Sequence, residues 1–545
     1  MITTVNSSRR KFFLMPIPPT PNGRLHLGHI AGPYLRMDML CRYLRSQGHR
    51  VRVVSAVDGF DSYVLWKGLQ ETRQPEDVCR DYHAQIARDL AALDIEVDDF
   101  LDLVQGPYAA SHADNARRAV ETLVASGCTE TITEKVLYSR ATGRYLTGAW
   151  LTGQCPQCEA PAAGYFCEAC GAHFRPESML HPEPRMGDAD LEWRETENLF
   201  LRVPDEAELL RRLQSAGAPE KFIAVVLRFL SHERGLFRLT APGDWGVAWS
   251  ADRWGNPRVL FEAGWEYGLT CGERYAQMAG GEAHPMIHGS DVTTLVSFGI
   301  DNAVLLLAGS VAVMNALPER QPFDHVLTNY FYNLQGSKFS TSRLHVVWAA
   351  DIVDMTPASS DAVRYFLARE SPEEQTTNFD VGDFIRFVND DLAGMVQARI
   401  DAAWETLTRG PQREWSISAS VAERFEASSS TLDHAFRLDA VSVRAACAVL
   451  LAWVGLPRVD LGSPEEAYGW LKGLAYFAAP VMPRLAAELW RGLGHEGMPL
   501  RHDMLCASTP NAQGNCRAWF SPLSLESLRP CLPVSLSLDG VESHA

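Results

Sequence analysis

The sequence predicts an α/β fold in which an open parallel sheet, covered by helices on both faces, is interrupted by a metal-binding insertion. Three features predict it. An apolar segment at 11–15 leads through a turn into a helical pattern, as a strand followed by a helix would. A second apolar segment, 51–57, ends at an acidic residue. Four cysteines fall in two close pairs between residues 155 and 170.

The composition is that of a large globular protein. With 545 residues, 46% of them apolar and 21% charged, the chain is long enough for about three or four domains. It has no run of about 18 apolar residues, and residues 1–6 lack the apolar centre of a signal peptide, so we expect a cytoplasmic protein without a membrane partner. The net charge of −17 slows the approach of a polyanion such as RNA unless basic residues cluster locally.

The first predicted strand ends where a phosphate site is expected. Prolines between 16 and 21 end it, Asn22 and Gly23 form a turn, and the tetrad His26-Leu27-Gly28-His29 opens a helix. The free N–H groups and the dipole at a helix start favour phosphate binding. Gly28 allows a ring to approach the backbone closely, and two imidazoles one turn apart can donate to phosphate oxygens. The alternative is a pair of surface or capping histidines.

The second predicted strand, 51–57, places Asp58 at the carboxyl end of a parallel strand. Open α/β sheets bind ligands at that edge. The alternative is that Asp58 caps a helix.

A Gly/Ser/Lys/Thr segment lies far downstream, at 333–343. A mobile loop with Lys338 and hydroxyls such as that of Ser342 can hold a triphosphate and stabilise the charge of departing pyrophosphate. Taken alone, such a stretch is more often a solvated loop.

The cysteine pairs form a C-x2-C…C-x2-C pattern with eight residues between them. Two such turns bring four thiolates into a tetrahedron, which is typical of a closed structural zinc site, with iron as the alternative. The predicted ligands are Cys155, Cys158, Cys167 and Cys170. A closed shell has no open position for chemistry, so its metal would fold the insertion that carries it.

These motifs together resemble a known family. Residues 19–29 resemble the HIGH signature of class I aminoacyl-tRNA synthetases, and 333–343 resemble their KMSKS loop. The cysteine knuckle, followed by 194–200, is similar to methionyl-tRNA synthetases, and 384–393 and 477–494 look like parts of their helical C-terminal domain. The resemblance spans roughly residues 10 to 500.

The resemblance implies a Rossmann-like class I synthetase catalytic domain with a zinc-knuckle insertion, plus a C-terminal α-helical bundle. The expected boundaries are 1–120 and 236–325 for the two halves of the catalytic domain, 121–235 for the connective insertion, 326–386 for the connecting domain with the Lys338 loop, and 387–545 for the helical anticodon-binding-like domain and tail.

The resemblance also implies a substrate set and residue roles. The substrates would be an amino acid and ATP with Mg²⁺. His26, His29, Lys338 and Ser342 would stabilise the phosphates; Asn22, Gly28, Thr341 and Arg343 would bind ATP; Asp291 would bind the ribose hydroxyls; and Asp58 would hold the amino group. One departure is that Thr341 stands where the loop's second lysine is expected, so a charge facing pyrophosphate is lost.

The amino-acid pocket departs further from the methionine pattern. Thr20, after Pro18, replaces an expected Tyr; Leu260 replaces a Trp; Val296 replaces a His; only Tyr267 is kept. Losing this wall removes a few kcal/mol of discrimination, so we do not expect methionine as the preferred substrate. Glu262 and Glu266 suggest a substrate with an additional cationic or hydroxyl-bearing group, although each is more often a surface or cap carboxylate.

The residues expected to bind the anticodon also differ from the family pattern. The expected Asn-Leu-x-x-Arg helix reads Ala398–Ala402, and the expected stacking Trp falls within Gly455–Arg458. We therefore expect an enzyme that passes an activated amino acid to a small molecule in specialised metabolism, as in joining N-hydroxylysine to another amino acid before a separate cupin partner forms an N–N bond. The alternatives are a divergent methionine-tRNA ligase and a weakly active ATP-binding regulatory protein.

Overall fold

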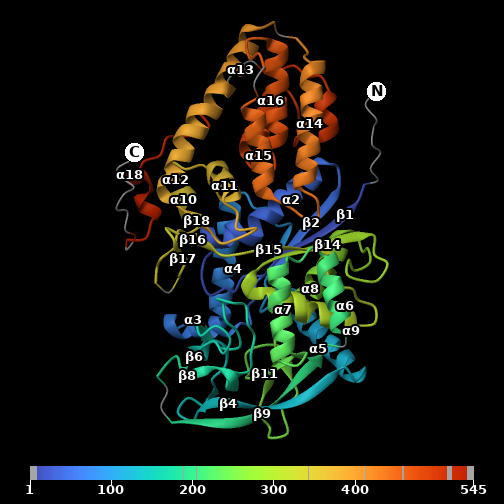
Figure 1. The fold of residues 1–545 in the computed structure, drawn as a ribbon, viewed down its shortest axis with the longest axis vertical. Helices are drawn as coiled ribbons and strands as arrows, with labels where there is room; N and C mark the ends of the chain where they lie inside the picture. Colours follow the sequence, from blue (N-terminus) through green and yellow to red (C-terminus); the bar gives the residue numbers. More distant parts are fainter. Residues whose placement is uncertain are drawn as a thin grey trace.

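A computed structural model describes residues 9–187, 190–203, 205–341, 343–411, 413–456, 459–511, 518–534 and 536. Figure 1 shows a helical bundle at one end, a central sheet, and an insertion of antiparallel strands at the other end. Within these residues, no helix is both long and apolar enough to cross a membrane.

The central sheet has five parallel strands in the order β15-β14-β1-β2-β3. The strands are β1 (Lys11–Pro16), β2 (Arg50–Ala56), β3 (Asp99–Leu101), β14 (Val292–Gly299) and β15 (His325–Asn329). Side chains of β1 alternate between two cores, because successive residues of a strand point to opposite faces. Phe12 and Leu14 enter the core shared with the helical bundle, whereas Phe13 and Met15 enter the core on the other face.

The helical C-terminal part packs on one face of this sheet. Its first core unites β1 and α2 (Leu35–Ser46) with the bundle helices, so the bundle and the sheet share one apolar interior. The bundle helices are α11 (Ser360–Arg369), α12 (Val381–Arg386), α13 (Gln397–Arg409), α14 (Ala419–Ala435), α15 (Val443–Val454), α16 (Pro464–Ala478) and α17 (Pro483–Gly492). The opposite face is covered by α5 (Ala109–Ala125), α7 (Glu220–His232) and α8 (Trp265–Met278).

The insertion is built from antiparallel strands. A four-stranded sheet has the order β10-β9-β4-β5, and a three-stranded sheet the order β7-β6-β8. The strands are β4 (Thr129–Ser139), β5 (Arg144–Tyr145), β6 (Leu151–Gln154), β7 (Pro161–Ala163), β8 (Leu180–Pro184), β9 (Leu191–Arg202) and β10 (Leu236–Arg238). Helix α5 crosses the expected boundary at 120, and β10 belongs to the insertion's sheet by its pairing with β9.

Two further small sheets connect these parts. Strands β11 (Thr240–Pro242), β12 (Ala248–Trp249) and β13 (Arg258–Leu260) form one, which precedes α8; β16 (Tyr332–Leu334), β17 (Ser337–Lys338) and β18 (Thr377–Phe379) form the other. The architecture confirms the predicted α/β fold with an inserted segment and a helical C-terminal part.

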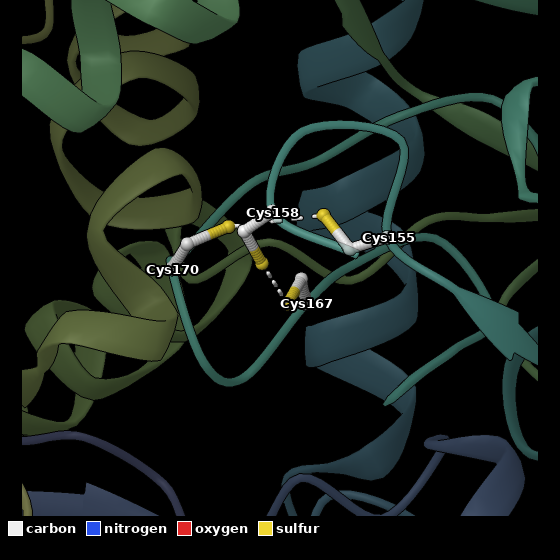
Figure 2. Close-up of side chains that lie close together, drawn as sticks. All are labelled: Cys155, Cys158, Cys167 and Cys170. Carbon is white, nitrogen blue, oxygen red and sulfur yellow. Dashed lines mark hydrogen bonds between the residues drawn. The ribbon is translucent and has the colours of Figure 1, made fainter. Parts of the chain in front are cut away.

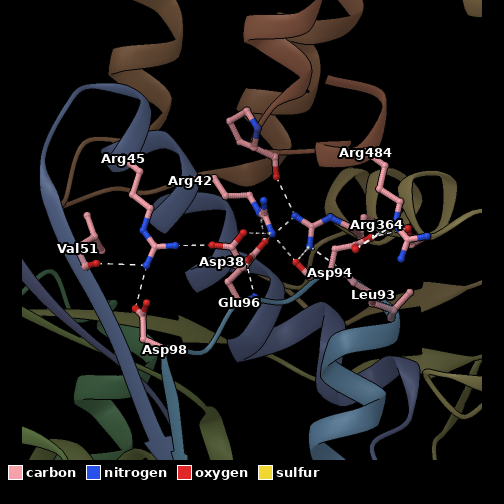
Figure 3. Close-up of polar contacts among 12 residues, drawn as sticks. Asp38, Arg42, Arg45, Val51, Leu93, Asp94, Glu96, Asp98, Arg364 and Arg484 are labelled. Atoms are coloured by element: carbon pink, nitrogen blue, oxygen red, sulfur yellow. Dashed lines mark hydrogen bonds and ion pairs between the residues drawn. The ribbon is translucent and has the colours of Figure 1, made fainter. Parts of the chain in front are cut away.

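A buried ionic network joins the sheet's first helix to the bundle (Figure 3). Arg364 Nη2 lies 2.6 Å from Asp38 Oδ2, and both side chains are fully buried. Arg42 Nε is 2.9 Å from the same oxygen. Arg364 also donates to the carbonyls of Leu93 and Pro480, each at 2.9 Å. Burial raises the pKa of Asp38, but the charges of Arg42 and Arg364 outweigh burial and leave that pKa below its usual value.

This network predicts a large effect of Arg364→Ala. Removing one partner of a buried ion pair leaves an uncompensated charge, which costs about 3–5 kcal/mol. We expect the substitution to lower the free energy of unfolding by that amount, measured by urea denaturation followed by tryptophan fluorescence. Arg437→Ala is the control, because the Arg437–Asp439 pair is half exposed; its midpoint should stay nearly unchanged. Equal midpoints for the two variants would contradict the assignment.

Candidate active site

The candidate site lies at the carboxyl edge of the parallel sheet. Chain order reverses direction between β1 and β14, and in open α/β sheets the crevice at such a switch point binds ligands. His26, Asp58 and Asp301 follow β1, β2 and β14, respectively, and Asn329 is the last residue of β15.

The two histidines of the tetrad are stacked at the start of the helix after β1. Their ring centroids lie 3.7 Å apart. His26 Nδ1 accepts from the N–H of Gly28 at 3.1 Å, and His29 Nδ1 accepts from the N–H of His26 at 3.3 Å, which makes a reciprocal cap of α1 (Leu27–His29). Both histidines therefore do cap this helix, as the alternative interpretation held. Because both Nδ1 atoms accept, each neutral ring carries its remaining proton on Nε2.

Both histidines are neutral near pH 7. Burial, followed by the charges of His29 and Lys338, holds the pKa of His26 well below its usual value. Burial and Lys338 lower the pKa of His29 to about 4. Neutral rings with an Nε2–H are hydrogen-bond donors that need no proton from solvent.

The downstream loop closes over this tetrad. The Phe339 ring stacks on His26 with centroids 4.6 Å apart. The backbone of Leu27 donates to Val347 at 3.0 Å, so the segment after the loop is paired to the tetrad. A Cβ on Gly28 would lie 2.9 Å from Phe339 Cδ2 and 3.0 Å from the His26 ring. Glycine is thus required here by close packing.

Lys338 lies beside the tetrad and pairs with the cysteine knuckle. Its ammonium group forms an ion pair with Glu168, and it sits over the Phe331 ring at 4.7 Å. Thr341 and Arg343 are exposed on the same loop, which is where a substrate could reach them. Ser342 lies outside the described residues, as do Pro457 and Arg458 of the expected anticodon segment.

The end of β2 brings Asp58 to a cluster of acidic groups around Tyr267. The Tyr267 hydroxyl lies 2.8 Å from Asp58 Oδ1 and is also hydrogen-bonded to Glu262. The helix-cap alternative for Asp58 is wrong, because Asp61 caps α3 (Ser62–Glu71) by accepting from Tyr63 at 2.7 Å. Glu266 is buried in the first turn of α8, where both its oxygens accept from the N–H of Ala263 at 3.1 Å.

The acidic groups are shifted toward their neutral forms. Burial, and next the charge of Glu262, raises the pKa of Asp58 well above its usual value. Burial and Asp58 raise the pKa of Asp61 to about 7. Burial also raises the pKa of Glu262. Several carboxyl groups with shifted pKa values in one place are a common feature of functional sites.

The remaining pocket residues take different positions. Leu260 and Val296 are buried with Tyr267 in the core on the α5–α8 face. Thr20 hydrogen-bonds Asp61, and the carbonyl of Pro19, next to Pro18, accepts from Asp58 at 3.0 Å. Asn22 lies in the loop between β1 and the tetrad, where its N–H donates to Thr20. The segments that carry Thr20 and Asp58 therefore lie side by side.

Asp291 does not reach the site. It precedes β14 at the end where Lys11 pairs with Val292, whereas the tetrad follows the opposite end of β1. The strand separates these edges by about 20 Å at 3.3 Å per residue. Asp291 is exposed and forms an ion pair of 3.0 Å with Lys11. The expectation that Asp291 binds ribose is corrected accordingly.

Two polar residues at the site's edge were not anticipated. Asp301 follows β14 and Asn329 ends β15, so the rule applied to Asp58 would have found them once these strands were recognised. The Oδ1 atom of Asn329 is buried without a hydrogen-bond partner, and a Cβ on Gly32 would meet Asn329 Nδ2 at 2.6 Å. The side chain is held against the helix that follows the tetrad.

The four predicted cysteines come together in two facing loops (Figure 2). Their sulfur atoms all lie within 4.8 Å of one another, with Cys155–Cys170 at 3.8 Å and Cys158–Cys167 at 3.7 Å. Tetrahedral zinc with Zn–S bonds of about 2.3 Å requires S···S distances of about 3.8 Å. The Cys155 sulfur also accepts from the N–H of Gln157 at 3.4 Å. The geometry fits a tetrahedral four-thiolate metal centre.

The packing around Gly28 predicts that Gly28→Ala destabilises the protein. The added methyl must push Phe339 off His26, and overpacking of this kind costs about 1–3 kcal/mol. We expect a lower midpoint in thermal unfolding. Gly23→Ala is the matched control in the same loop, because a Cβ at Gly23 meets nothing within 4 Å. If both variants melt like the parent, the contact is not present in solution.

Comparison with known proteins shows which family this chain is similar to. The family model described as "tRNA synthetases class I (M)" matches residues 16–401. The methionine–tRNA ligase of Chlorobaculum tepidum is 28% identical over 71% of this chain and 60% of its own length. That of Roseiflexus castenholzii is 30% identical over 69% of this chain and 65% of its own length. The match therefore spans less than two thirds of these relatives.

The solved structures agree in fold. Mycobacterium tuberculosis methionyl-tRNA synthetase bound by methionyl-adenylate has a TM-score of 0.68 at 16% identity, covering 94% of this chain and 99% of that one. Its apo form gives a TM-score of 0.64 at 16% identity. Since the family model covers more than half of the chain and the tetrad, the Lys338 loop and the cysteine knuckle all lie within it, the chain belongs to the class I tRNA synthetases of the methionyl type.

Proposed function

We propose that this protein activates an amino acid with ATP, forming an aminoacyl adenylate and pyrophosphate. The observation that carries the proposal is the pair of stacked, neutral imidazoles beside Lys338 at the carboxyl edge of the sheet. Family membership supports the same reaction.

The proposed chemistry needs positioning and charge rather than a nucleophilic side chain. The amino-acid carboxylate attacks the α-phosphorus of ATP, and the bond between the α- and β-phosphates breaks as pyrophosphate departs. The Nε2–H groups of His26 and His29 and the ammonium of Lys338 donate to phosphate oxygens, whose charge grows in the transition state. Asp58 holds the substrate's amino group.

Metal ions have two proposed roles. Mg²⁺ would arrive on the phosphates, since it binds through substrate phosphates and few carboxylates. Zinc would occupy the cysteine knuckle in a structural role. The knuckle also carries Glu168, so folding of the metal centre sets the position of the group that pairs with Lys338.

We further propose that the amino acid is not methionine and that the acyl acceptor is a small molecule of specialised metabolism, for example in joining N-hydroxylysine to another amino acid with a separate cupin. The departures at Thr20, Leu260 and Val296 support a changed substrate. The altered helix at 398–402 supports an acceptor other than tRNA.

The second candidate function is charging of methionine tRNA. The observation in its favour is that the relatives named above are methionine–tRNA ligases. Methionine-dependent exchange between ATP and pyrophosphate, followed by transfer to tRNA, would establish this function and exclude the small-molecule acceptor.

The proposed chemistry predicts that His26→Asn and His29→Asn reduce ATP–pyrophosphate exchange by about 10²–10³-fold each, as removal of one transition-state donor does in other enzymes. Asparagine keeps an acceptor near the Nδ1 position, so the helix cap persists while the Nε2–H donor is lost. The control is His83→Asn, because His83 stacks on Phe100 away from the tetrad. Unchanged exchange in both tetrad variants would rule out this role.

The cysteine geometry predicts about one zinc per chain in the purified protein, measured by mass spectrometry of the metals. Cys158→Ser and Cys167→Ser should lose the metal. Cys506→Ser should retain it, because Cys506 lies outside the cluster. Iron, or metal content unaffected by the two cluster substitutions, would overturn the assignment.

A further inference from the structure

Three carboxyl groups from separate elements lie close together, and two of them contact the Tyr267 hydroxyl. Asp58 follows β2, Asp61 begins α3, and Glu262 precedes α8. Asp58 and Glu262 are hydrogen-bonded to each other, and each contacts the hydroxyl of Tyr267. The three groups form an acidic cluster, which brings together parts of the chain more than 200 residues apart in sequence.

The acidic cluster has too few hydrogens for its acceptors. A tyrosine hydroxyl carries one proton, so it can donate to Asp58 or to Glu262 but not to both. Glu262 also accepts from the backbone N–H of Phe60, but the contact between Asp58 and Glu262 still needs a proton on one of the two carboxyls or a donor from a ligand. The raised pKa values of Asp58 and Glu262 describe the first alternative in the ligand-free protein.

No protein cation compensates the cluster. Among the described residues, no Lys or Arg forms an ion pair with Asp58, Asp61 or Glu262. The one basic neighbour is His112, and burial lowers its pKa to about 4, so it is neutral. Uncompensated buried carboxylates are costly, and they persist where a ligand supplies the charge.

An independent observation also points to a missing ligand. The side chain of Glu262 is 10% exposed and that of His112 is fully buried. Glu262 Oε1 and His112 Nε2 face each other at 3.5 Å, and neither has a hydrogen-bond partner. A donor group entering the cluster would satisfy the unpaired oxygen of Glu262.

The arrangement suits an organic cation better than a metal ion. In the described part of the chain, only the four cysteines bring three or more ligand atoms within 4.8 Å of one another. The carboxylates are spread too widely for one ion. The α-ammonium of an amino acid accounts for one charge, at Asp58, and leaves Glu262 and Asp61 without a cationic partner among the described residues.

We propose that the amino acid activated by this protein carries a second cation on its side chain, which Glu262 binds with the support of Asp61, while Asp58 holds the α-ammonium. The inference rests on the proposed activation of an amino acid at this site. It assigns the substrate to the class of basic amino acids, and it assigns Glu262 as the residue that selects them.

The test compares substrates that differ only at the side-chain end. ATP–pyrophosphate exchange is measured with lysine, ornithine and N6-hydroxylysine, with norleucine as the apolar analogue, with 6-hydroxynorleucine as the neutral hydroxyl analogue, and with methionine. At least one basic amino acid should exceed norleucine and methionine by tenfold or more in kcat/KM. Equal or better exchange with norleucine, methionine or 6-hydroxynorleucine overturns the proposal.

Variants separate selection from catalysis. Glu262→Gln keeps the size of the side chain and removes its charge, so it should erase at least tenfold of the preference for the basic amino acid over norleucine. Asp58→Asn should instead reduce exchange with every amino acid. Glu273→Gln, an equivalent change on α8 where Glu273 bonds Asn115, should alter neither. An equal loss for all amino acids in Glu262→Gln would contradict a selective role.

A binding measurement distinguishes failure of this inference from failure of the proposed function. If no amino acid supports exchange, the activation reaction is refuted, and calorimetric titration of the parent protein with lysine, ornithine and norleucine still decides the substrate class. Tighter binding of a basic amino acid, weakened by Glu262→Gln, supports the inference. Binding of none of them, or equal binding of norleucine, overturns it.

Discussion

Burial of strand β1 on both faces is the constraint on which the rest of the structure depends. Its side chains alternate between the core shared with the bundle and the core under α5 and α8. The strand is therefore held between two apolar interiors, and the loop that leaves its carboxyl end has little freedom. The tetrad's position at the carboxyl edge of the sheet follows from where β1 ends.

The bundle contributes to this constraint as much as the sheet does. Asp38 follows the tetrad on α2, and its ion pair with Arg364 is fully buried. A buried pair of this kind is weak support for net stability, but it penalises any packing in which the partners separate. The helical part thus fixes the orientation of α2, the helix that follows the tetrad.

The site combines buried titratable groups, whose pKa values are shifted toward their neutral forms, with one half-exposed charged group, Lys338. His26 and His29 are neutral because of burial and of Lys338, and the carboxyls around Tyr267 are shifted toward protonation. Lys338 is half exposed and pairs with Glu168 of the knuckle. An anionic ligand that displaced Glu168 from Lys338 would meet two aligned donors, whereas a cation would be drawn to the carboxyl cluster. The two halves of the site therefore suit ligand groups of opposite charge.

The sequence by itself determined the features that depend on neighbouring residues. The cysteine spacing, the tetrad after a strand and the acidic residue at the end of β2 are local patterns, since turns and strand ends are encoded within a few residues. The family resemblance extended these patterns to the overall architecture.

Tertiary structure decided which distant residues meet. Asp291 was assigned to the site by family resemblance, and only the pairing of β14 with β1 shows that it lies at the opposite edge of the sheet, beside Lys11. The sharing of one tyrosine hydroxyl by Asp58 and Glu262, and the pairing of Lys338 with Glu168, join residues far apart in the chain. Such contacts arise only when separate elements pack together, because local propensity does not specify long-range partners.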